Sequence, residues 1–335
     1  WRLDVDFLTS EGQQADTSTL LRAWRSGTGL VSLMDGGFAQ LPDGWLERYG
    51  NILRELWDER NDRGELSPYC APAIAELLED EQEWSPPDLT RLKTFLDSGE
   101  GLAETPLPAE FTGELRSYQQ VGVDWMRFLS GMGFHGILAD DMGLGKTIQT
   151  LVTLAVAGGP CLVVAPTSVL RNWEKEGSRF VPHLTMNLYH GPKRQLLDVD
   201  ITLTSYALLR IDVAKLSKKK WVYAVLDEAQ FIKNPRSKTA QAACCLDAEN
   251  RLALTGTPVE NRLEELWSQF RFLMPGLLGG LDSFRENFTK PIENGDKGSV
   301  IRLKKRIQPY VLRRLKKQVA TELPPLTEMV IRCEM

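Results

Sequence analysis

One stretch near the middle of the chain limits its possible folds more than any other. Residues 137–150 read ILADDMGLGKTIQT, which is an apolar run, two aspartates, a glycine turn and the start of a helical pattern. A buried strand, a glycine loop and a helix N-terminus form an anion site, because N–H groups point at the anion and the helix dipole favours negative charge. Lys146 would then reach the β/γ-phosphates of a nucleotide, and Thr147 would ligate Mg²⁺. Asp140 stands where the strict pattern has glycine, so a tight turn without a ligand is the alternative.

The composition bounds the class of protein. With 335 residues, of which 42% are apolar, the chain is long enough for two domains with sizeable cores. It has no run of about 18 apolar residues, so we expect no membrane span, and its acidic start is unlike a signal peptide. The five cysteines are scattered without a C-x-x-C pair, which predicts neither a zinc site nor disulfides and favours a reducing, cytoplasmic compartment.

Charge is divided unevenly along the chain. The net charge is −5, but residues 1–110 carry 22 acidic and 9 basic residues, whereas residues 111–335 carry 23 acidic and 31 basic ones. This asymmetry predicts separate domains. The basic domain over residues 111–335 is expected to bind a polyanion better than the acidic one. Residues 302–317 hold eight basic residues and no acidic one, which leaves polyanion contact and docking onto another domain as two open roles.

Residues 1–105 are predicted to form a small, acidic, mostly helical accessory domain. Two apolar runs flank Asp35-Gly36-Gly37 within residues 30–40, which predicts a β-hairpin. The segment 99–108 has the composition of a linker. Helical patterns cover residues 17–25, 44–59, 71–78 and 88–96.

Strands and helices alternate after the linker. This alternation predicts an α/β fold over residues 106–280, with a parallel sheet covered by helices on both faces. From residue 281 the alternation stops, and residues 281–335 are predicted as a helical extension with helices near 282–288 and 300–315. Ligands of such sheets bind beyond the carboxyl ends of the strands, so the loops after each strand are informative. The predicted strands are 136–139, 161–165, 186–190, 201–205, 221–226 and 251–254.

A segment before the glycine loop is a candidate base-binding element. Residues 111–125 have a helical pattern that contains Arg116, Tyr118 and Gln119. The Gln119 amide can donate to and accept from adenine at once, with the other two side chains framing the pocket. An ordinary amphipathic helix is an equal alternative.

The loops after the last two predicted strands carry further chemistry. Asp227 and Glu228 follow one strand, and two carboxylates on the sheet of a phosphate loop suit a metal and water site. Asp227 would hold Mg²⁺ and Glu228 would orient and deprotonate the attacking water. A solvated strand end is the alternative. Thr255-Gly256-Thr257 follows the other strand, where hydroxyls beside a γ-phosphate would sense its presence; a plain turn is the alternative.

Two other loops place hydroxyl groups at predicted helix starts. Thr167 and Ser168 follow the strand at 161–165, and Thr204 and Ser205 end the strand at 201–205. Hydroxyl and N–H groups at helix N-termini suit DNA phosphates, which fix register without reading sequence.

Together, these motifs resemble the first ATPase lobe of a superfamily-two helicase, specifically of the Swi/Snf-like group of double-stranded DNA translocases. The resemblance covers about residues 111–335 and implies a RecA-like lobe. Asp140-Asp141 is normal for the group, which resolves the alternative for the glycine loop. The accessory domain resembles the helicase-associated regions of bacterial members only weakly. The matching stretches are LRSYQQVGVDWM, ILADDMGLGKTIQT, LVVAPTSVLRNWEKE, ITLTSYALLR, VLDEAQFIKN, LALTGTPVENRLEELWS and IQPYVLRRLKKQVATELPPLTE.

The resemblance implies roles for individual residues. Lys146, Asp227 and Glu228 support hydrolysis, and Gln119 reads adenine. Gln230 stands where many members have histidine, which leaves its coupling role open. The residues implied in phosphate and Mg²⁺ binding are Asp141, Met142, Gly143, Leu144, Gly145, Lys146 and Thr147. Those implied in DNA contact are Thr167, Ser168, Thr204 and Ser205. Those implied in coupling the ATP state to lobe movement are Gln230, Thr255, Gly256, Thr257, Arg313 and Arg314.

The resemblance also implies a function. ATP hydrolysis would open and close two lobes, step the protein along duplex DNA without strand separation, and displace or remodel bound proteins. The second lobe supplies an arginine finger worth about 10³–10⁵ in rate. We expect this chain to lack that lobe, to bind nucleotide weakly and to hydrolyse it very slowly by itself.

Two other functions are compatible with the sequence. One is a protein-directed ATPase whose acidic domain grips a polymerase or another nucleoprotein complex. The other is a regulatory fragment in which residues 1–105 mask the DNA-binding face. In each case we expect a cytoplasmic location, at the nucleoid in a bacterium.

Overall fold

The computed structural model describes residues 5–61, 63–70, 73–74, 77, 102–256 and 262–319. Its centre is a seven-stranded sheet in the order β11-β5-β10-β9-β6-β8-β7, with every neighbouring pair parallel. The predicted parallel α/β sheet is therefore confirmed. The strands are β5 (Gly136–Leu138), β6 (Cys161–Ala165), β7 (Met186–Leu188), β8 (Ile201–Ser205), β9 (Trp221–Asp227), β10 (Ala248–Leu254) and β11 (Val311–Leu312).

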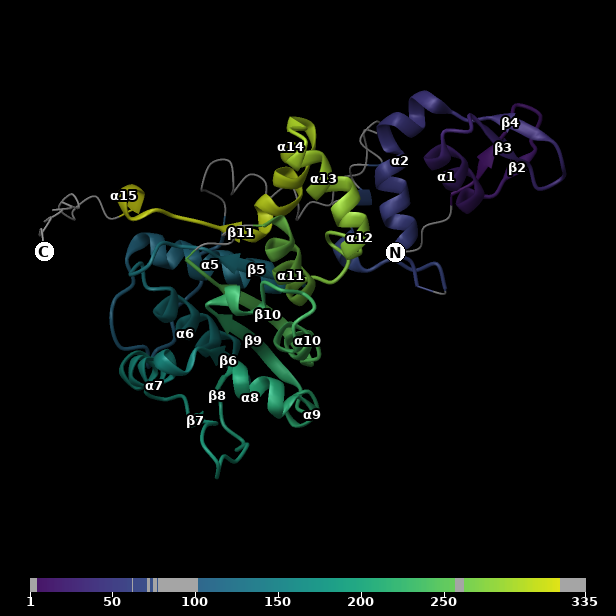
Figure 1. Ribbon diagram of the computed structural model, residues 1–335. Coiled ribbons are helices and arrows are strands. Elements are labelled where there is room, and N and C mark those ends of the chain that lie inside the picture. The colour runs from purple at the N-terminus through teal and green to yellow at the C-terminus, as the bar shows by residue number, and fades with distance from the viewer. Residues whose placement is uncertain are drawn as a thin grey trace, which may run out of the picture.

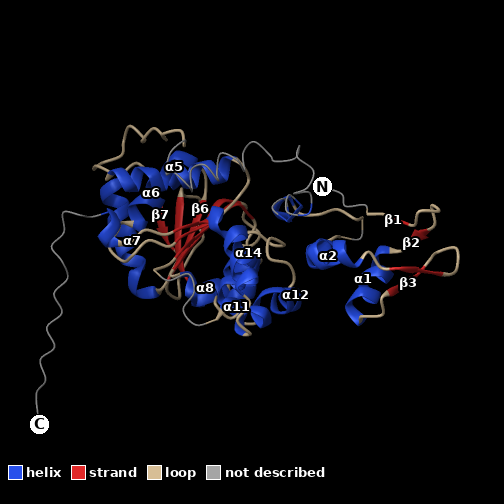
Figure 2. Ribbon diagram, turned by 90° about the horizontal axis from the view of Figure 1, so that it is seen from above, coloured by secondary structure: helices blue, strands red, loops and turns tan. Residues whose placement is uncertain are grey.

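Helices cover both faces of this sheet, as Figures 1 and 2 show. The central strands are continuously buried, and burial of each Val or Leu side chain contributes about 1.5–3 kcal/mol. In the part of the chain that the structure describes, no helix combines the length and the apolar character needed to cross a bilayer. One face carries α5 (Ser117–Gly131), α6 (Lys146–Ala157) and α7 (Thr167–Phe180); the other carries α8 (Tyr206–Ile211), α10 (Lys238–Cys244) and α11 (Leu263–Leu273). The connections include α9 (Val213–Leu216) and the short helix η2 (Ala229–Ile232).

The edge strand β11 corrects the predicted helix over residues 300–315. The helix α14 (Lys297–Ile307) ends earlier, and a short turn η4 (Gln308–Tyr310) leads into β11. Pro309 has no N–H to continue the helix, and the N–H of Ala139 donates to Leu312 O at 2.7 Å. The sheet thus takes a strand from beyond residue 280. The extension before it comprises α12 (Leu281–Phe284), the π-helical turn η3 (Arg285–Thr289) and α13 (Lys290–Glu293), and α15 (Lys316–Val319) follows it.

The accessory region has the expected helices and hairpin. Asp16 caps its first helix by accepting from Thr19 N at 2.8 Å. The hairpin β3–β4 pairs antiparallel, and a second small pair, β1–β2, was not predicted. The helix predicted at 88–96, and most of that at 71–78, lie outside the described residues. The elements are β1 (Phe7–Leu8), β2 (Gln14–Ala15), α1 (Thr17–Ser26), β3 (Leu30–Ser32), β4 (Phe38–Gln40), α2 (Asp43–Asp58) and η1 (Pro68–Cys70).

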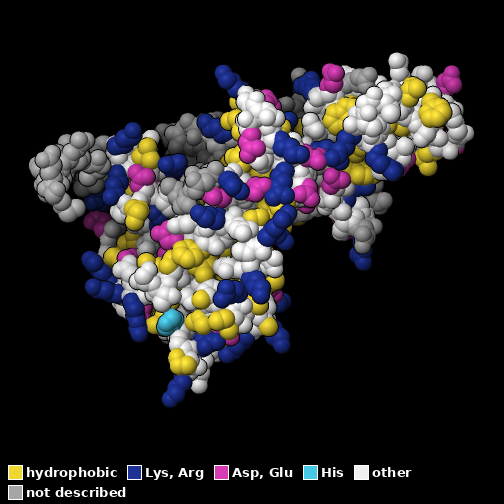
Figure 3. All heavy atoms as spheres, in the orientation of Figure 1, with side chains coloured by type: hydrophobic (Ala, Val, Ile, Leu, Met, Phe, Trp, Pro, Cys, Tyr) yellow, Lys and Arg dark blue, Asp and Glu magenta, His cyan; other side chains and the backbone are white. Residues whose placement is uncertain are grey.

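Ion pairs join the accessory region to the helical extension. Glu55 on α2 pairs with Arg306 on α14, and their side chains are 6% and 2% exposed. Arg54 and Arg25 both pair with Glu286, at 3.3 and 2.8 Å. Figure 3 shows acidic and basic side chains intermixed along this junction. The buried Arg306 in the basic segment thus serves docking, and the accessory region lies beside α12–α14, away from α6 and α7 (Figure 1).

A neutral histidine makes another contact between η1 and the sheet. The Nδ1 atom of His135 accepts from the N–H of Arg251 at 3.3 Å, so its Nε2–H donates to the hydroxyl oxygen of Tyr69 at 3.0 Å. Burial, aided by the Arg251 charge, lowers the pKa of His135 to about 4.

Acidification is therefore expected to destabilise the fold through His135. Between its folded pKa of about 4 and its ordinary value of 6.5, the unfolded state binds more protons. The free energy of unfolding should fall as the pH drops through this window, by about 3 kcal/mol in total. Urea unfolding at a series of pH values checks this, with His135→Gln predicted to flatten the slope and the exposed His183→Gln to leave it unchanged. An unchanged slope in His135→Gln would contradict the assignment.

Candidate nucleotide-binding site

The glycine loop has a backbone that side chains would obstruct. Gly143 and Gly145 have φ of 83° and 78°, in the left-handed region that favours glycine. A Cβ on Gly145 would lie 2.4 Å from Nε2 of Gln119. The loop leads directly into α6, where no side-chain cap occupies the first-turn N–H groups. This cradle fits the phosphates of a nucleotide.

Lys146 lies at the centre of an acidic group. Its ammonium donates to the main-chain carbonyl oxygens of Asp140 and Asp141, at 2.6 and 3.4 Å. Burial lowers the pKa of Lys146, opposed by Glu228, Asp140, Asp227 and Asp141 in that order. The structure therefore brings the predicted phosphate-binding lysine and the two predicted carboxylates into one site.

The predicted metal-binding aspartate is held firmly at the end of β9. Asp227 Oδ1 accepts from the N–H of Glu228 at 2.9 Å, and Oδ2 accepts from the indole N–H of Trp173 at 2.8 Å. Burial raises the pKa of Asp227, and the Trp173 hydrogen bond opposes this rise. Together with the half-buried Thr147 hydroxyl, this carboxylate offers the oxygen donors that Mg²⁺ prefers.

Glu228 has a strained backbone. Within the described ranges it is the one non-glycine residue with positive φ, at 52°. Such strain costs about 1–3 kcal/mol and gathers at functional sites. The amide of Gln230 donates to Glu228 Oε2 at 2.9 Å and accepts from the Thr255 hydroxyl at 3.2 Å. Gln230 thus joins the loop after β9 to the loop after β10.

The loop after β10 also approaches the glycine loop. A Cβ built on Gly256 would lie 3.7 Å from Cγ of Met142, whose side chain is exposed at the tip of the glycine loop. Thr257 lies outside the described residues. Of the predicted coupling residues, Gln230, Thr255 and Gly256 are therefore grouped around the site.

The amide of Gln119 is occupied by the protein itself. Its Oε1 accepts from Arg116 N at 2.9 Å, and its Nε2 donates to Leu144 O at 3.2 Å, so Gln119 braces the glycine loop from the start of α5. Gln119 is 9% exposed, Tyr118 is half-buried and Arg116 is exposed. Adenine recognition by Gln119 stays a prediction and would require these bonds to be exchanged.

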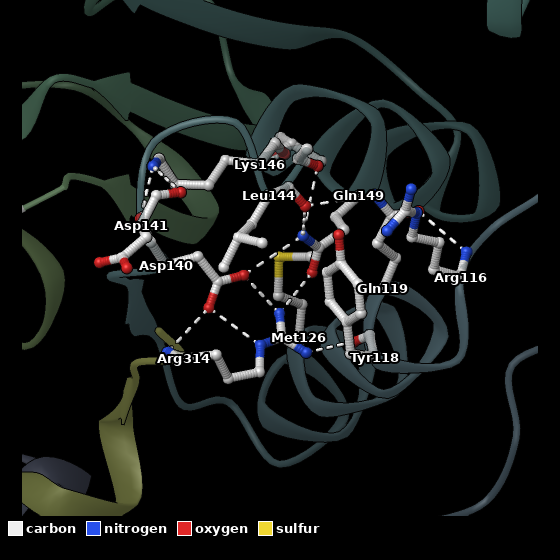
Figure 4. A network of polar contacts seen from close by, with 12 residues as sticks. Arg116, Tyr118, Gln119, Met126, Asp140, Asp141, Leu144, Lys146, Gln149 and Arg314 are labelled. Atoms are coloured by element: carbon white, nitrogen blue, oxygen red, sulfur yellow. Dashed lines mark hydrogen bonds and ion pairs between the residues drawn. The ribbon is translucent and has the colours of Figure 1, made fainter. Parts of the chain in front are cut away.

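Sequence reasoning missed a buried network beneath the glycine loop, which Figure 4 shows. Asp140 is 0% exposed, and both of its carboxylate oxygens accept from the guanidinium of Arg314. The guanidinium also donates to Gln149 Oε1 at 2.8 Å and to Tyr118 O. Asp140 therefore replaces the expected glycine because its carboxylate anchors the segment after β11. In the sequence, this network is indicated only by the aspartate at a glycine position and by the basic run at 302–317. Neither feature shows that the two segments contact each other.

The neighbouring main chain reinforces this anchor. Asp141 N donates to Arg314 O at 3.0 Å, and Asp141 Oδ2 accepts from Lys316 N at 3.0 Å. Arg313 is exposed and points to no partner in this network. Of the two predicted arginines, Arg314 is thus the one placed against the site.

The four residues predicted to contact DNA fall into different environments. Thr167 and Ser168 are exposed in the first turn of α7. Ser205 is buried and caps α8 by accepting from Leu208 N at 3.3 Å. Thr204 is fully buried, and its hydroxyl donates to a main-chain carbonyl at 3.2 Å, so its side chain faces the interior. Only the two α7 residues present their side chains on the surface.

Comparison with known proteins agrees with this geometry. The family model of the SNF2-related domain matches residues 118–335. Helicase ssl-1 of Caenorhabditis elegans is 40% identical over 255 residues, which cover 69% of this chain and 11% of that protein. The putative ATP-dependent helicase/translocase YwqA of Bacillus subtilis is 42% identical over 295 residues, covering 83% and 32%.

A solved structure extends the similarity to three dimensions. The Sulfolobus solfataricus SWI2/SNF2 ATPase core in complex with dsDNA has 45% sequence identity and a TM-score of 0.63, covering 67% of this chain and 49% of that one. The chain thus spans about half the length of this solved core, and about a third or less of the two relatives above.

Loss of the Asp140–Arg314 pair is expected to destabilise the lobe. Arg314→Ala would leave a buried carboxylate without its cation, which costs about 3–5 kcal/mol. The exposed neighbour Arg313→Ala should change the free energy of unfolding by less than about 0.5 kcal/mol. Chemical denaturation of both variants checks this, and equal stabilities would show that the buried pair does not anchor the segment.

Proposed function

This chain belongs to the SNF2-related family, and from that premise we propose that it provides the ATP-binding lobe of a DNA-stimulated ATPase that translocates on duplex DNA. The observation that carries the proposal is the convergence on Lys146 of the glycine loop, Asp227 and Glu228. These are the groups that phosphoryl transfer to water requires. Translocation would displace or remodel proteins bound to the DNA, in the cytoplasm and, in a bacterium, at the nucleoid.

Each part of the site has a distinct task in this proposal. The glycine-loop N–H groups and Lys146 hold the phosphates of ATP. Thr147 and Asp227 would hold Mg²⁺, which would supply positive charge beside the transferred phosphoryl group. Glu228 orients the attacking water and takes its proton, and the Gln230 bridge to Thr255 keeps the Glu228 carboxylate in place.

DNA contact is assigned to the start of α7. Thr167 and Ser168 offer exposed hydroxyls at the start of α7, whereas the hydroxyls of Thr204 and Ser205 before α8 are buried and bonded within the protein. Exposed hydroxyls of this kind bind backbone phosphates independently of sequence. The complex of a similar ATPase core with dsDNA supports duplex DNA as the partner.

The position of the accessory region supports a role in docking onto the helical extension rather than in masking the DNA-binding face. It is joined to the helical extension by the buried Glu55–Arg306 pair, and it lies away from α7 and α8 (Figures 1 and 2). We therefore prefer DNA translocation to the regulatory alternative. A protein-directed ATPase, with a polymerase or other nucleoprotein as the main stimulus, is the outcome to expect if DNA has no effect on the rate.

The proposed function is tested by the ATPase rate of the full-length protein with and without duplex DNA. We expect strong stimulation that weakens steeply as salt is raised, because bound phosphates release counterions. A rate that is indifferent to DNA would reject the proposal.

Glu228→Gln should abolish turnover and preserve nucleotide binding. Removal of a general base costs about 10²–10⁴ in rate, whereas the phosphate cradle is untouched. Steady-state ATPase assays and titration with a fluorescent ATP analogue measure the two effects. Glu249→Gln, at an exposed position on β10, is the matched control and should behave as wild type. Substantial turnover by Glu228→Gln would remove this residue from the reaction.

These 335 residues alone are expected to bind ATP and to hydrolyse it slowly. They span 49% of the similar ATPase core, and an arginine supplied by the other half would account for about 10³–10⁵ in rate. A thermal shift with ATP and Mg²⁺ would report binding, and phosphate release would report turnover. Turnover at the rate of the DNA-stimulated full-length protein would contradict this expectation.

A further inference from the structure

Two side chains that were not among the predicted site residues both bind Asp227. Trp173 on α7 is 1% exposed, and its indole N–H donates to Asp227 Oδ2 at 2.8 Å. Tyr206, the first residue of α8, is buried, and its hydroxyl donates to the main-chain carbonyl of Asp227 at 2.8 Å. Asp227 is therefore held at its carboxylate and at its backbone by two different helices.

Of these two helices, α7 begins at the proposed DNA-binding surface. Trp173 follows Thr167 by six residues on α7, which is about 9 Å along a helix. Ser205 caps α8 immediately before Tyr206. A shift of either helix start therefore moves a hydrogen-bond donor of Asp227.

Ordinary core packing does not require this convergence. A buried indole N–H needs an acceptor, but any main-chain carbonyl suffices, as the bond from Trp221 shows at 2.9 Å. Tyr189 likewise donates its hydroxyl to Asp212, a carboxylate outside the site. Trp173 and Tyr206, in contrast, meet at one aspartate from separate elements.

An exposed aromatic ring extends the connection to the surface. Phe231, on η2, is 52% exposed and stacks on Tyr206, with ring centroids 4.9 Å apart and an interplanar angle of 6°. It is three residues beyond Glu228. Tyr206 thus lies between a surface ring and the main chain of the metal-binding loop.

We propose that Trp173 and Tyr206 are positioning residues for the Mg²⁺-binding Asp227, and that they transmit to it DNA-backbone contact at the start of α7. The inference rests on the proposed function. DNA bound at the start of α7 fixes that helix; the Trp173 hydrogen bond then fixes the carboxylate of Asp227 in its metal-binding orientation, while the Tyr206 hydrogen bond holds its main chain. Loss of either donor weakens Mg²⁺ binding and uncouples DNA binding from hydrolysis.

The test uses Trp173→Phe and Tyr206→Phe in the full-length protein. The matched controls are Trp221→Phe and Tyr189→Phe, which remove the same donors from buried sites elsewhere on the sheet. Two quantities are measured: the ratio of ATPase rates with and without duplex DNA, and the Mg²⁺ concentration for half-maximal binding of a fluorescent ATP analogue, which does not depend on turnover. Each test variant should lower the ratio about tenfold, as expected for a lost bond to a catalytic-site group, and raise the Mg²⁺ requirement several-fold. The controls should keep both quantities at wild-type values.

Several outcomes would overturn the inference. Wild-type values in both test variants would do so, and so would equal losses in the controls, because the effect would then follow from any buried bond. Tyr206→Phe is nearly isosteric, so it decides the matter if Trp173→Phe does not fold. A wild-type protein that DNA fails to stimulate rejects the proposed function instead, and the Mg²⁺ requirement without DNA then decides whether the two residues position Asp227.

Discussion

The buried ion pair between Asp140 and Arg314 is the constraint on which the nucleotide site depends. A carboxylate with no exposure is costly unless it is paired and hydrogen-bonded, and here one guanidinium meets both of its oxygens. Such pairs often add little net stability, because desolvation offsets the attraction, but they can define register. The strand β11 has only two residues, and a strand so short has little pattern of its own to prevent slippage. Arg314 therefore determines where the strand sits beside β5, and Asp140 holds the glycine loop to it.

The sequence predicts those features of the fold and the site whose pattern lies within a few consecutive residues. It does not predict contacts between residues that are far apart in the chain. The strands β6 and β8 occupy the predicted residues, because a continuous run of four or five apolar or β-branched residues between turn signals identifies a buried strand. The glycine loop and Asp227-Glu228 were found because their chemistry is written in consecutive residues. The pairing of Asp140 with Arg314 joins positions 174 residues apart, and no local pattern encodes it. The same limit hid the Trp173 bond to Asp227.

For several residues the sequence left open whether the side chain binds a partner molecule or the protein itself, and burial in the structure answers this question. Both faces of β8 are covered, so Thr204 and Ser205 are buried whichever face they occupy, and their hydroxyls bond within the protein. The basic run at 302–317 divides in a similar way. Arg306 pairs with the carboxylate of Glu55 and Arg314 with that of Asp140, and both arginine side chains are largely buried. Lys304 and Lys305 are exposed. Net charge predicted a partner of opposite sign, but only burial shows which partner each residue has.

The strained backbone at Glu228 links the loop after β9 to the loop after β10. A left-handed backbone at a glutamate persists only where the surroundings over-determine it, and here its N–H binds Asp227 and its carboxylate accepts from Gln230. Gln230 is in turn held by Thr255 on the loop after β10. The conformation of Glu228 therefore depends on the loops of two adjacent strands at once. Because a strained conformer relaxes when either restraint is released, a small displacement of one loop is enough to move the carboxylate that we propose as the general base. The position of the Glu228 carboxylate thereby depends on the relative position of the loops after β9 and β10, which the Gln230–Thr255 hydrogen bond joins.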